Sequence, residues 1–178
     1  HSGGGVTVSG GEPLLQADFV RALFARLKDQ GVHTAADTCG NVPWAAFESV
    51  LPFTDLFLFD VKHIDSAAHR ALTGAGNERI LDNLRRLSDA GARIEIRMPL
   101  VPGANDGMDT LERIGALLGG LNVETMRVLP YHALARSKYA ALGKPDTMPD
   151  VPSPDDGQIA RAVTALRAHG VNAVSGRE

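Results

Sequence analysis

Apolar residues recur along the chain with two alternating spacings, one typical of strands and one typical of amphipathic helices. Compact apolar runs predict five strands and a short sixth, at residues 6–9, 32–36, 56–61, 93–100, 125–129 and 171–174. Apolar positions three and four residues apart predict helices around Phe19, Val20, Leu23, Phe24 and Leu27; Ile80, Leu84 and Leu87; Leu111, Ile114, Leu117 and Leu118; and Ile159, Val163 and Leu166. A short helix is expected after Pro43 and Trp44. Strands that alternate with helices in this way predict an α/β fold with a parallel sheet.

Helix ends and chain length narrow the fold class. Three of the predicted helices stop at a glycine that is followed at once by a strand, namely Gly31, Gly91 and Gly170. The last helix is expected to begin with Ser153 as its cap and Pro154 in its first turn. About five strand–helix units fit the length, against the eight of a complete (β/α)8 barrel. An open or partial barrel is therefore predicted, with a doubly wound sheet as the rival.

The run 56–61 is nearly all apolar, which predicts a strand buried on both faces of the sheet. Polar residues and glycines gather instead at the strand ends, and the strand interiors offer almost none. In barrels the active site lies where the strands end. We therefore expect one mouth to collect Ser9, Gly10, Gly11, Glu12, Asp37, Thr38, Asp60, Lys62, Arg97 and His132.

Two adjacent glycines, Gly10 and Gly11, would let a ligand approach the backbone closely, so that an amino group could meet their carbonyl oxygens. Lys62 and Arg97 can neutralise a carboxylate. Arg97 could instead pair structurally with an acidic neighbour such as Glu95 or Asp60. The glycines and the two cations together suit an amino-acid ligand.

Two acids and two neighbouring ring side chains indicate which further groups the ligand carries. Asp37 and Asp60 can hold an ammonium group or a hard cation through oxygen. Tyr131 and His132 can hydrogen-bond a sugar hydroxyl or flank a base. The expected ligand is a zwitterion that carries a nucleoside.

Five segments in this order, at 4–13, 37–40, 60–62, 97–103 and 129–132, resemble the motifs of the radical S-adenosylmethionine (SAM) enzymes that activate glycyl-radical enzymes. The resemblance runs from Gly4 to about Gly143 and on through the last helix. It implies a partial (β/α)6 TIM-like barrel whose strand-end residues bind SAM. It also implies a [4Fe–4S] cluster on a Cys-x-x-x-Cys-x-x-Cys loop that follows the family's first strand.

The same resemblance implies reductive cleavage of SAM to a 5′-deoxyadenosyl radical, which takes hydrogen from a glycine of a partner enzyme. The implied partners are a glycyl-radical enzyme and an electron donor such as flavodoxin or ferredoxin. The loops at 99–106 and 131–143 are expected to line the lateral gap that admits the partner's glycine segment. No catalytic acid or base in this chain is required.

The sequence departs from the family at its cysteines. Cys39 is the single cysteine of the 178 residues, so the chain cannot supply the cluster ligands. Because His1 is not an initiator methionine, we expect a chain cut from a longer protein, without the family's first strand and cluster loop. Residues 1–178 are then one radical SAM core domain without radical chemistry of its own. Cys39 itself is expected to be a small buried filler.

Two other functions stay open at this point. Lys62 at a strand end permits an aldolase-like lyase that forms a Schiff base. That hypothesis leaves the glycine pair and Asp37 unexplained. The second alternative is a non-enzymatic scaffold that binds SAM weakly or binds only a protein partner.

Composition excludes several classes. The net charge is −3 and no basic tract points to nucleic acid. No apolar run approaches the ~20 residues that a membrane span needs. A lone cysteine rules out an internal disulfide, and a cytoplasmic location is the default expectation. The remaining histidines show no metal-ligand spacing and are expected to be structural or at the surface: His33, His63, His69 and His169.

Overall fold

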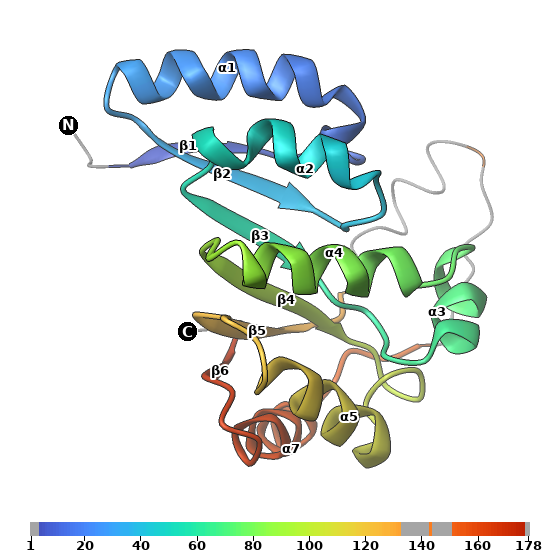
Figure 1. Ribbon diagram of the computed structural model, residues 1–178. Helices are drawn as coiled ribbons and strands as arrows, with labels where there is room; N and C mark the ends of the chain where they lie inside the picture. The colour runs from blue at the N-terminus through green and yellow to red at the C-terminus, as the bar shows by residue number, and fades with distance from the viewer. Residues whose placement is uncertain (1–3, 133–142, 144–150, 177–178) are drawn as a thin grey trace.

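The computed structural model describes residues 4–132, 143 and 151–176, and within them one parallel sheet (Figure 1). Its strands are β1 (Gly5–Val8), β2 (His33–Thr38), β3 (Leu56–Asp60), β4 (Ile94–Leu100), β5 (Thr125–Pro130) and β6 (Ala173–Ser175). They lie side by side in chain order, and each pairs with the next in parallel. In the described part of the chain β1 and β6 are not paired with each other, so the sheet stays open.

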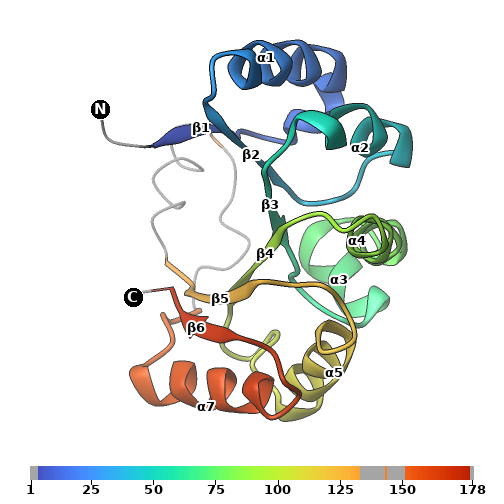
Figure 2. The ribbon, with the colours of Figure 1, turned by 60° about the vertical axis from the view of Figure 1, so that its left-hand side comes forward.

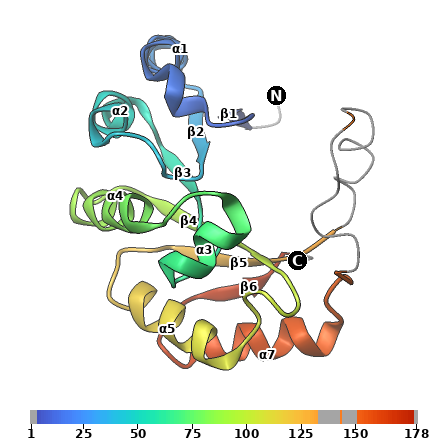
Figure 3. The ribbon, with the colours of Figure 1, turned by 90° about the vertical axis from the view of Figure 1, so that its right-hand side faces the viewer.

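The helices lie on one side of this sheet. They are α1 (Ala17–Asp29), α2 (Trp44–Val50), α3 (Ser66–Thr73), α4 (Glu78–Asp89), α5 (Met108–Leu118) and α7 (Asp156–Arg167), with short 3-10 helices η1 (Pro13–Gln16) and η2 (Leu51–Phe53). Figures 2 and 3 show the sheet as an arc with the helices along its outer, convex side. Each new strand joins the same edge of the growing sheet. Because the crossover connections are right-handed, every helix then lies on one face of the sheet. The strand order thus confirms the partial barrel and excludes the doubly wound sheet.

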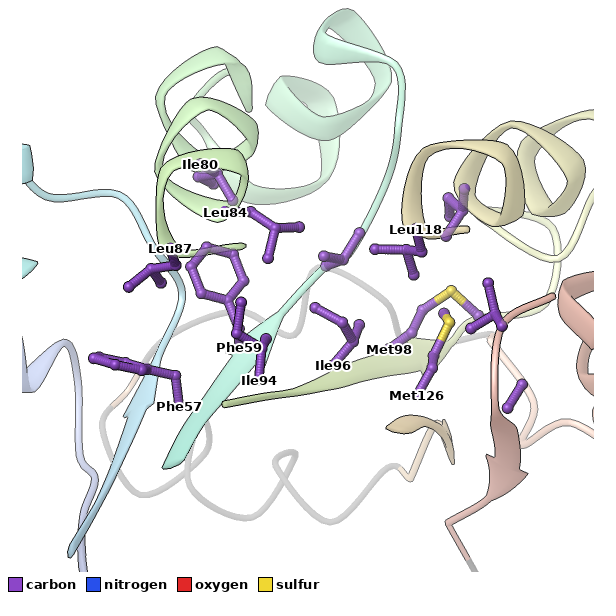
Figure 4. Close-up of a cluster of buried hydrophobic side chains, with 14 of the residues drawn as sticks. Phe57, Phe59, Ile80, Leu84, Leu87, Ile94, Ile96, Met98, Leu118 and Met126 are labelled. Carbon is purple, nitrogen blue, oxygen red and sulfur yellow. The ribbon is translucent and has the colours of Figure 1, made fainter. Parts of the chain in front are cut away.

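The core fills the space between the sheet and the helices. Alternate residues of β3 and β4 point outward, and their side chains are almost completely buried, as Phe57, Phe59, Ile94, Ile96 and Met98 are. Figure 4 shows them packed against the apolar stripe of α4, which consists of Ile80, Leu84 and Leu87. A strand alternates its side chains between two faces. The other residues of each strand therefore face the concave side of the arc.

Only one face of β3 is buried, so the prediction from 56–61 is wrong. Its burial alternates, with Leu56, Leu58 and Asp60 half-buried on the concave face. The helices of this barrel all lie outside, so the concave face has no apolar layer to pack against.

Other sequence expectations have mixed outcomes. Gly31, Gly91 and Gly170 do end their helices, each with a positive φ of 68° to 80°. Phe19, placed on a core stripe, is 62% exposed because it lies on the outer side of the first turn of α1. The helix α7 is capped by Asp155, whose carboxylate accepts from the N–H of Gln158, and not by Ser153. The helix α3 has no counterpart in the predicted pattern.

The parallel register arranges the concave side chains in rows. Asp60 of β3, Arg97 of β4 and Arg127 of β5 are successive partners and form one row. Asp37 of β2 and Glu95 of β4 lie in the row beneath, on either side of Leu58. The register thus gathers charged residues from four strands on the concave face. No helix of the described residues is long and apolar enough to cross a membrane.

Candidate functional site

Five of the predicted site residues form a continuous chain of contacts, here called the strand-end cluster: Ser9, Asp37, Asp60, Lys62 and Arg97. The Arg97 guanidinium lies 2.6 Å from Asp37 Oδ1 and 3.4 Å from Asp60 Oδ1. Lys62 Nζ lies 2.9 Å from Asp60 Oδ2, and Ser9 Oγ donates to Asp37 Oδ2 at 2.9 Å. The cluster confirms that these strand ends converge on one mouth, and it brings two acids together with two cations.

Arg97 is the centre of the cluster and has one unsatisfied atom. Its Nε is buried without a hydrogen-bond partner among the described residues. A buried N–H without an acceptor is uncommon in native proteins, and strain, a functional role or an ordered water or ion can account for it. Arg97 therefore has the capacity to donate to a further acceptor.

The glycine pair after β1 is open to a ligand. Gly10 has a φ of +126°, which a residue with a side chain rarely adopts. Among the described residues, a Cβ built at Gly10 or Gly11 would have no heavy atom within 4 Å. No side chain of the described residues would therefore block an approach to the backbone on the Cβ side of these two glycines.

Glu12 makes hydrogen bonds to other groups of the protein. Its Oε2 accepts from the backbone N–H of Cys39, and its Oε1 accepts from the N–H of Leu14. The Thr38 hydroxyl lies 2.9 Å from both carboxylate oxygens. Glu12 therefore fastens the loop after β1 to the end of β2, with Thr38 buried beneath.

Two buried asparagines fasten the remaining loops. Asn105 Nδ2 donates to the carbonyl oxygens of Lys62 and Pro99, both at 2.8 Å, and its Oδ1 accepts from the N–H of Val101. Asn83 on α4 donates to two carbonyl oxygens of the loop after β2, those of Gly40 and Val42. The sequence pattern did not reveal either asparagine, because a buried asparagine leaves no periodic signal.

A small pocket adjoins the cluster. It has a volume of 150 Å³, and Cys39, Asp60, Lys62 and His69 are among its lining residues. Burial raises the pKa of the Cys39 thiol, and the hydrogen-bonded Glu12 adds to this effect against a backbone hydrogen bond from Asn41. Cys39 is only half-buried and lines this pocket, so the expectation of a buried filler is wrong, because the loop after β2 leaves one side of Cys39 open. Ligand pockets are commonly ~300–1,000 Å³, so this pocket is smaller than a typical ligand site.

The strand interiors are more polar than the sequence pattern predicted. Glu95 of β4 and Arg127 of β5 face the concave side and form an ion pair of 2.9 Å. The alternation of polar and apolar residues in 94–100 and 125–130 is the signal that could have identified them.

His132 follows β5 at the same end of the sheet as Lys62 and is exposed. Among the described residues, no hydrogen bond or ion pair joins it to the strand-end cluster. Most of the expected partner loop 131–143 lies outside those residues. No group of three or more metal-ligating side chains occurs in the described ranges.

Comparison with known families defines the class. A model of the radical SAM superfamily matches residues 2–114. The chain belongs to the radical SAM superfamily. It is 48% identical over 168 residues to the pyruvate formate-lyase-activating enzyme of Staphylococcus aureus strain USA300, an alignment that covers 90% of this chain and 67% of the relative. The protein of that name from strain NCTC 8325 / PS 47 matches equally well.

Solved structures agree with this assignment. A domain of a pyruvate-formate lyase-activating enzyme from Bacteroides vulgatus ATCC 8482 superposes with a TM-score of 0.83 and 30% identity, covering 97% of this chain and 99% of that one. A radical SAM methyltransferase from Sphaerobacter thermophilus has a TM-score of 0.76 at 20% identity, over 96% of this chain and 50% of that one. The second likeness shows the shared fold alone.

Proposed function

We propose that this chain is the core of a glycyl-radical-enzyme activating enzyme, with pyruvate formate-lyase as the first partner to test. The observation that carries the proposal is the 48% identity to the Staphylococcus aureus activating enzymes over 90% of the chain. The chemistry comes from bound SAM, whose reductive cleavage gives a 5′-deoxyadenosyl radical that takes hydrogen from a glycine of the partner. The residues of this chain bind SAM, orient it and enclose it.

The strand-end cluster suits the amino-acid end of SAM by charge. The partly exposed side chains of Lys62 and Arg97 supply the positive charge for the carboxylate. The backbone at Gly10 and Gly11 offers carbonyl oxygens to the amino group. Asp37 and Asp60 already hold Arg97 and Lys62, but a carboxylate has about four lone-pair sites and can accept from a ligand ammonium as well.

The other site residues divide into supporting and ligand-facing groups. We assign Glu12 and Thr38 to positioning, because their oxygens are used in the clamp between β1 and β2. Ser9 holds Asp37 in place. His132 is exposed at the same end of the sheet and is assigned to the nucleoside part of SAM.

The [4Fe–4S] cluster of the superfamily does not fit the residues of this chain. Such clusters take several thiolate ligands, and the sequence holds one cysteine. The backbone N–H of Cys39 is hydrogen-bonded into the Glu12 clamp, and burial raises the pKa of its thiol. A protein that performs the reaction must therefore obtain the cluster from cysteines that this sequence does not contain.

Partner, domain and location assignments remain part of the proposal. We propose that residues 1–178 form one radical SAM core, that flavodoxin or ferredoxin is the electron donor, and that the protein is cytoplasmic. The partner's glycine segment would enter over the concave face, which no described helix covers (Figure 2). We propose that the segment 99–106, which begins in the last residues of β4, lines this entrance.

The Schiff-base alternative is less well supported. A lysine nucleophile must be neutral, and Lys62 is instead ion-paired with Asp60 at 2.9 Å. Borohydride trapping with a keto acid tests it directly, because a covalent adduct at Lys62 would favour the lyase.

The proposed function is tested by spectroscopy. The cluster-loaded, full-length form is mixed anaerobically with pyruvate formate-lyase, SAM and reductant. We expect the doublet of a glycyl radical in electron paramagnetic resonance, and its absence when SAM is omitted. SAM cleavage without any glycyl radical on this or another glycyl-radical enzyme would contradict the proposal.

A further inference from the structure

Arg97 and Arg127 lie side by side in the sheet with like charges. They are direct partners in the register of β4 and β5, and both face the concave side. Like charges opposite each other on neighbouring strands are destabilising unless each finds its own acid. Each arginine is paired with an acid of its own: Arg97 with Asp37, and Arg127 with Glu95.

The acid nearest to Arg97 along its own strand is Glu95. Residues two apart on a strand lie about 6.6 Å apart on the same face, whereas strands two places apart in a sheet are separated by about 10 Å. Asp37 is on β2, two strands away from Arg97, and one row lower. The Arg97 guanidinium nevertheless lies 2.6 Å from Asp37, and among the described residues no ion pair joins it to Glu95.

Arg127 accounts for this choice. Its Nε donates to Glu95 Oε1 at 2.9 Å, so the carboxylate of Glu95 is engaged. The Glu95 side chain is 18% exposed and that of Arg127 is 36% exposed, so the pair is only partly screened by water.

We propose that Arg127 is a positioning residue that occupies Glu95 and so directs Arg97 across the concave face to Asp37 and Asp60. Without Arg127, the carboxylate of Glu95 is left half-buried and unpaired. Arg97 then turns down its own strand to Glu95 and leaves Asp37. The consequence for SAM rests on the proposed function, because it assumes that the strand-end cluster binds this ligand.

The proposal makes a rescue prediction that a merely structural role would not. Arg127→Met removes the cation that holds Glu95, so Arg97 should move. Adding Glu95→Gln removes the charge that attracts Arg97, so Arg97 should return to Asp37. Arg127→Lys keeps a cation in reach of Glu95 and serves as the matched control.

The experiment has two measurements on the 178-residue chain and its variants. Crystal structures locate the Arg97 guanidinium, and titration calorimetry with SAM gives the affinity. We expect Arg127→Met to place Arg97 on Glu95 and to weaken SAM binding about tenfold, within the usual range for coupled neighbours. The double variant should restore Arg97 to Asp37 and bring the affinity to within about threefold of the original chain.

Two results would overturn the proposal: Arg97 remaining on Asp37 in Arg127→Met, or a double variant that stays as weak as the single one. The second result would mean that Arg127 acts through its other contacts. If Arg127→Met does not fold, Arg127→Gln gives the same test, because it also lacks the charge. If the chain binds no SAM at all, the ligand assignment fails, while the crystal structures still decide the role of Arg127.

Discussion

The side-chain amide of Asn105 donates a hydrogen bond of 2.8 Å to the backbone carbonyl of Lys62, 43 residues away in the sequence. The same amide donates to Pro99 in its own loop. Asn105 is 2% exposed, so these bonds are shielded from water. The loop that presents Lys62 is thereby fixed to the loop that follows β4.

Asn105→Ala should therefore loosen the site as well as the fold. It leaves two carbonyl oxygens and the N–H of Val101 without their partner, and each unsatisfied buried group costs about 1–3 kcal/mol. We expect urea denaturation to show a loss of at least ~2 kcal/mol in the free energy of unfolding. The control is Asn172→Ala, at an exposed asparagine that bonds to Glu124, and it should cost less than ~1 kcal/mol. Equal losses in the two variants would show that Asn105 is not a clamp.

Glu12→Ala should uncouple the ends of β1 and β2. The carboxylate accepts from two backbone N–H groups and from Thr38, and charged acceptors make bonds worth about 1.5–3 kcal/mol. We expect a lower midpoint in thermal unfolding and faster amide hydrogen exchange at Cys39. Glu12→Gln keeps one acceptor oxygen and should fall between Glu12→Ala and the original chain. Unchanged exchange at Cys39 in Glu12→Ala would contradict the assignment of Glu12 to positioning.

Two glycines with similar backbone angles should respond differently to alanine. Gly40 has a φ of +77°, and a Cβ there would clash with the ring of Phe59. Gly31 has a φ of +68°, and no heavy atom of the described residues lies within 4 Å of the added carbon. Gly31→Ala should cost only the backbone strain of about 1–2 kcal/mol, while Gly40→Ala adds about 1–3 kcal/mol of overpacking. Calorimetric unfolding of both variants checks this order, and a Gly31→Ala loss as large as that of Gly40→Ala would refute it.

Asp55, at the opposite end of the sheet, should make stability depend on acid pH. Burial opposes its ionisation, but hydrogen bonds from Lys28 and Thr34 prevail and lower the pKa of Asp55 to about 2. A carboxylate with a lowered pKa in the folded protein stabilises it above the unfolded pKa of about 3.9, and the contribution is lost as the pH falls toward 2. Because Lys28 is partly exposed, we expect about 1–2 kcal/mol.

The measurement compares the chain with Asp55→Asn by urea denaturation. The difference in unfolding free energy should be present at about pH 6 and should vanish near pH 2. A difference that does not change over this range would show that ionised Asp55 contributes nothing.

The outer face of the barrel could be predicted from the sequence, and the concave face could not. Apolar spacing located β1 to β5 to within a few residues, and the motifs at the strand ends identified the cluster of Asp37, Asp60, Lys62 and Arg97. The apolar run 56–61 predicts burial on both faces of β3, which is wrong. Such a run does not reveal that one face of an open barrel lacks a covering layer. The Glu95–Arg127 pair depends on the register between β4 and β5, which the sequence alone does not provide.

Binding of SAM by the strand-end cluster is tested most directly by calorimetric titration of SAM into the 178-residue chain and two lysine variants. Lys62→Ala removes a lysine that is ion-paired with Asp60 in the cluster, and Lys28→Ala removes one that is ion-paired with Asp55 at the far end of the sheet. The two lysine side chains are similarly exposed, at 34% and 39%. Loss of one partner of a desolvated charge pair costs about 2–5 kcal/mol in binding, so Lys62→Ala should weaken SAM at least ~30-fold while Lys28→Ala leaves the affinity unchanged. Equal SAM affinities for Lys62→Ala and the original chain, or no saturable binding by the original chain, would contradict the assignment of this cluster to SAM.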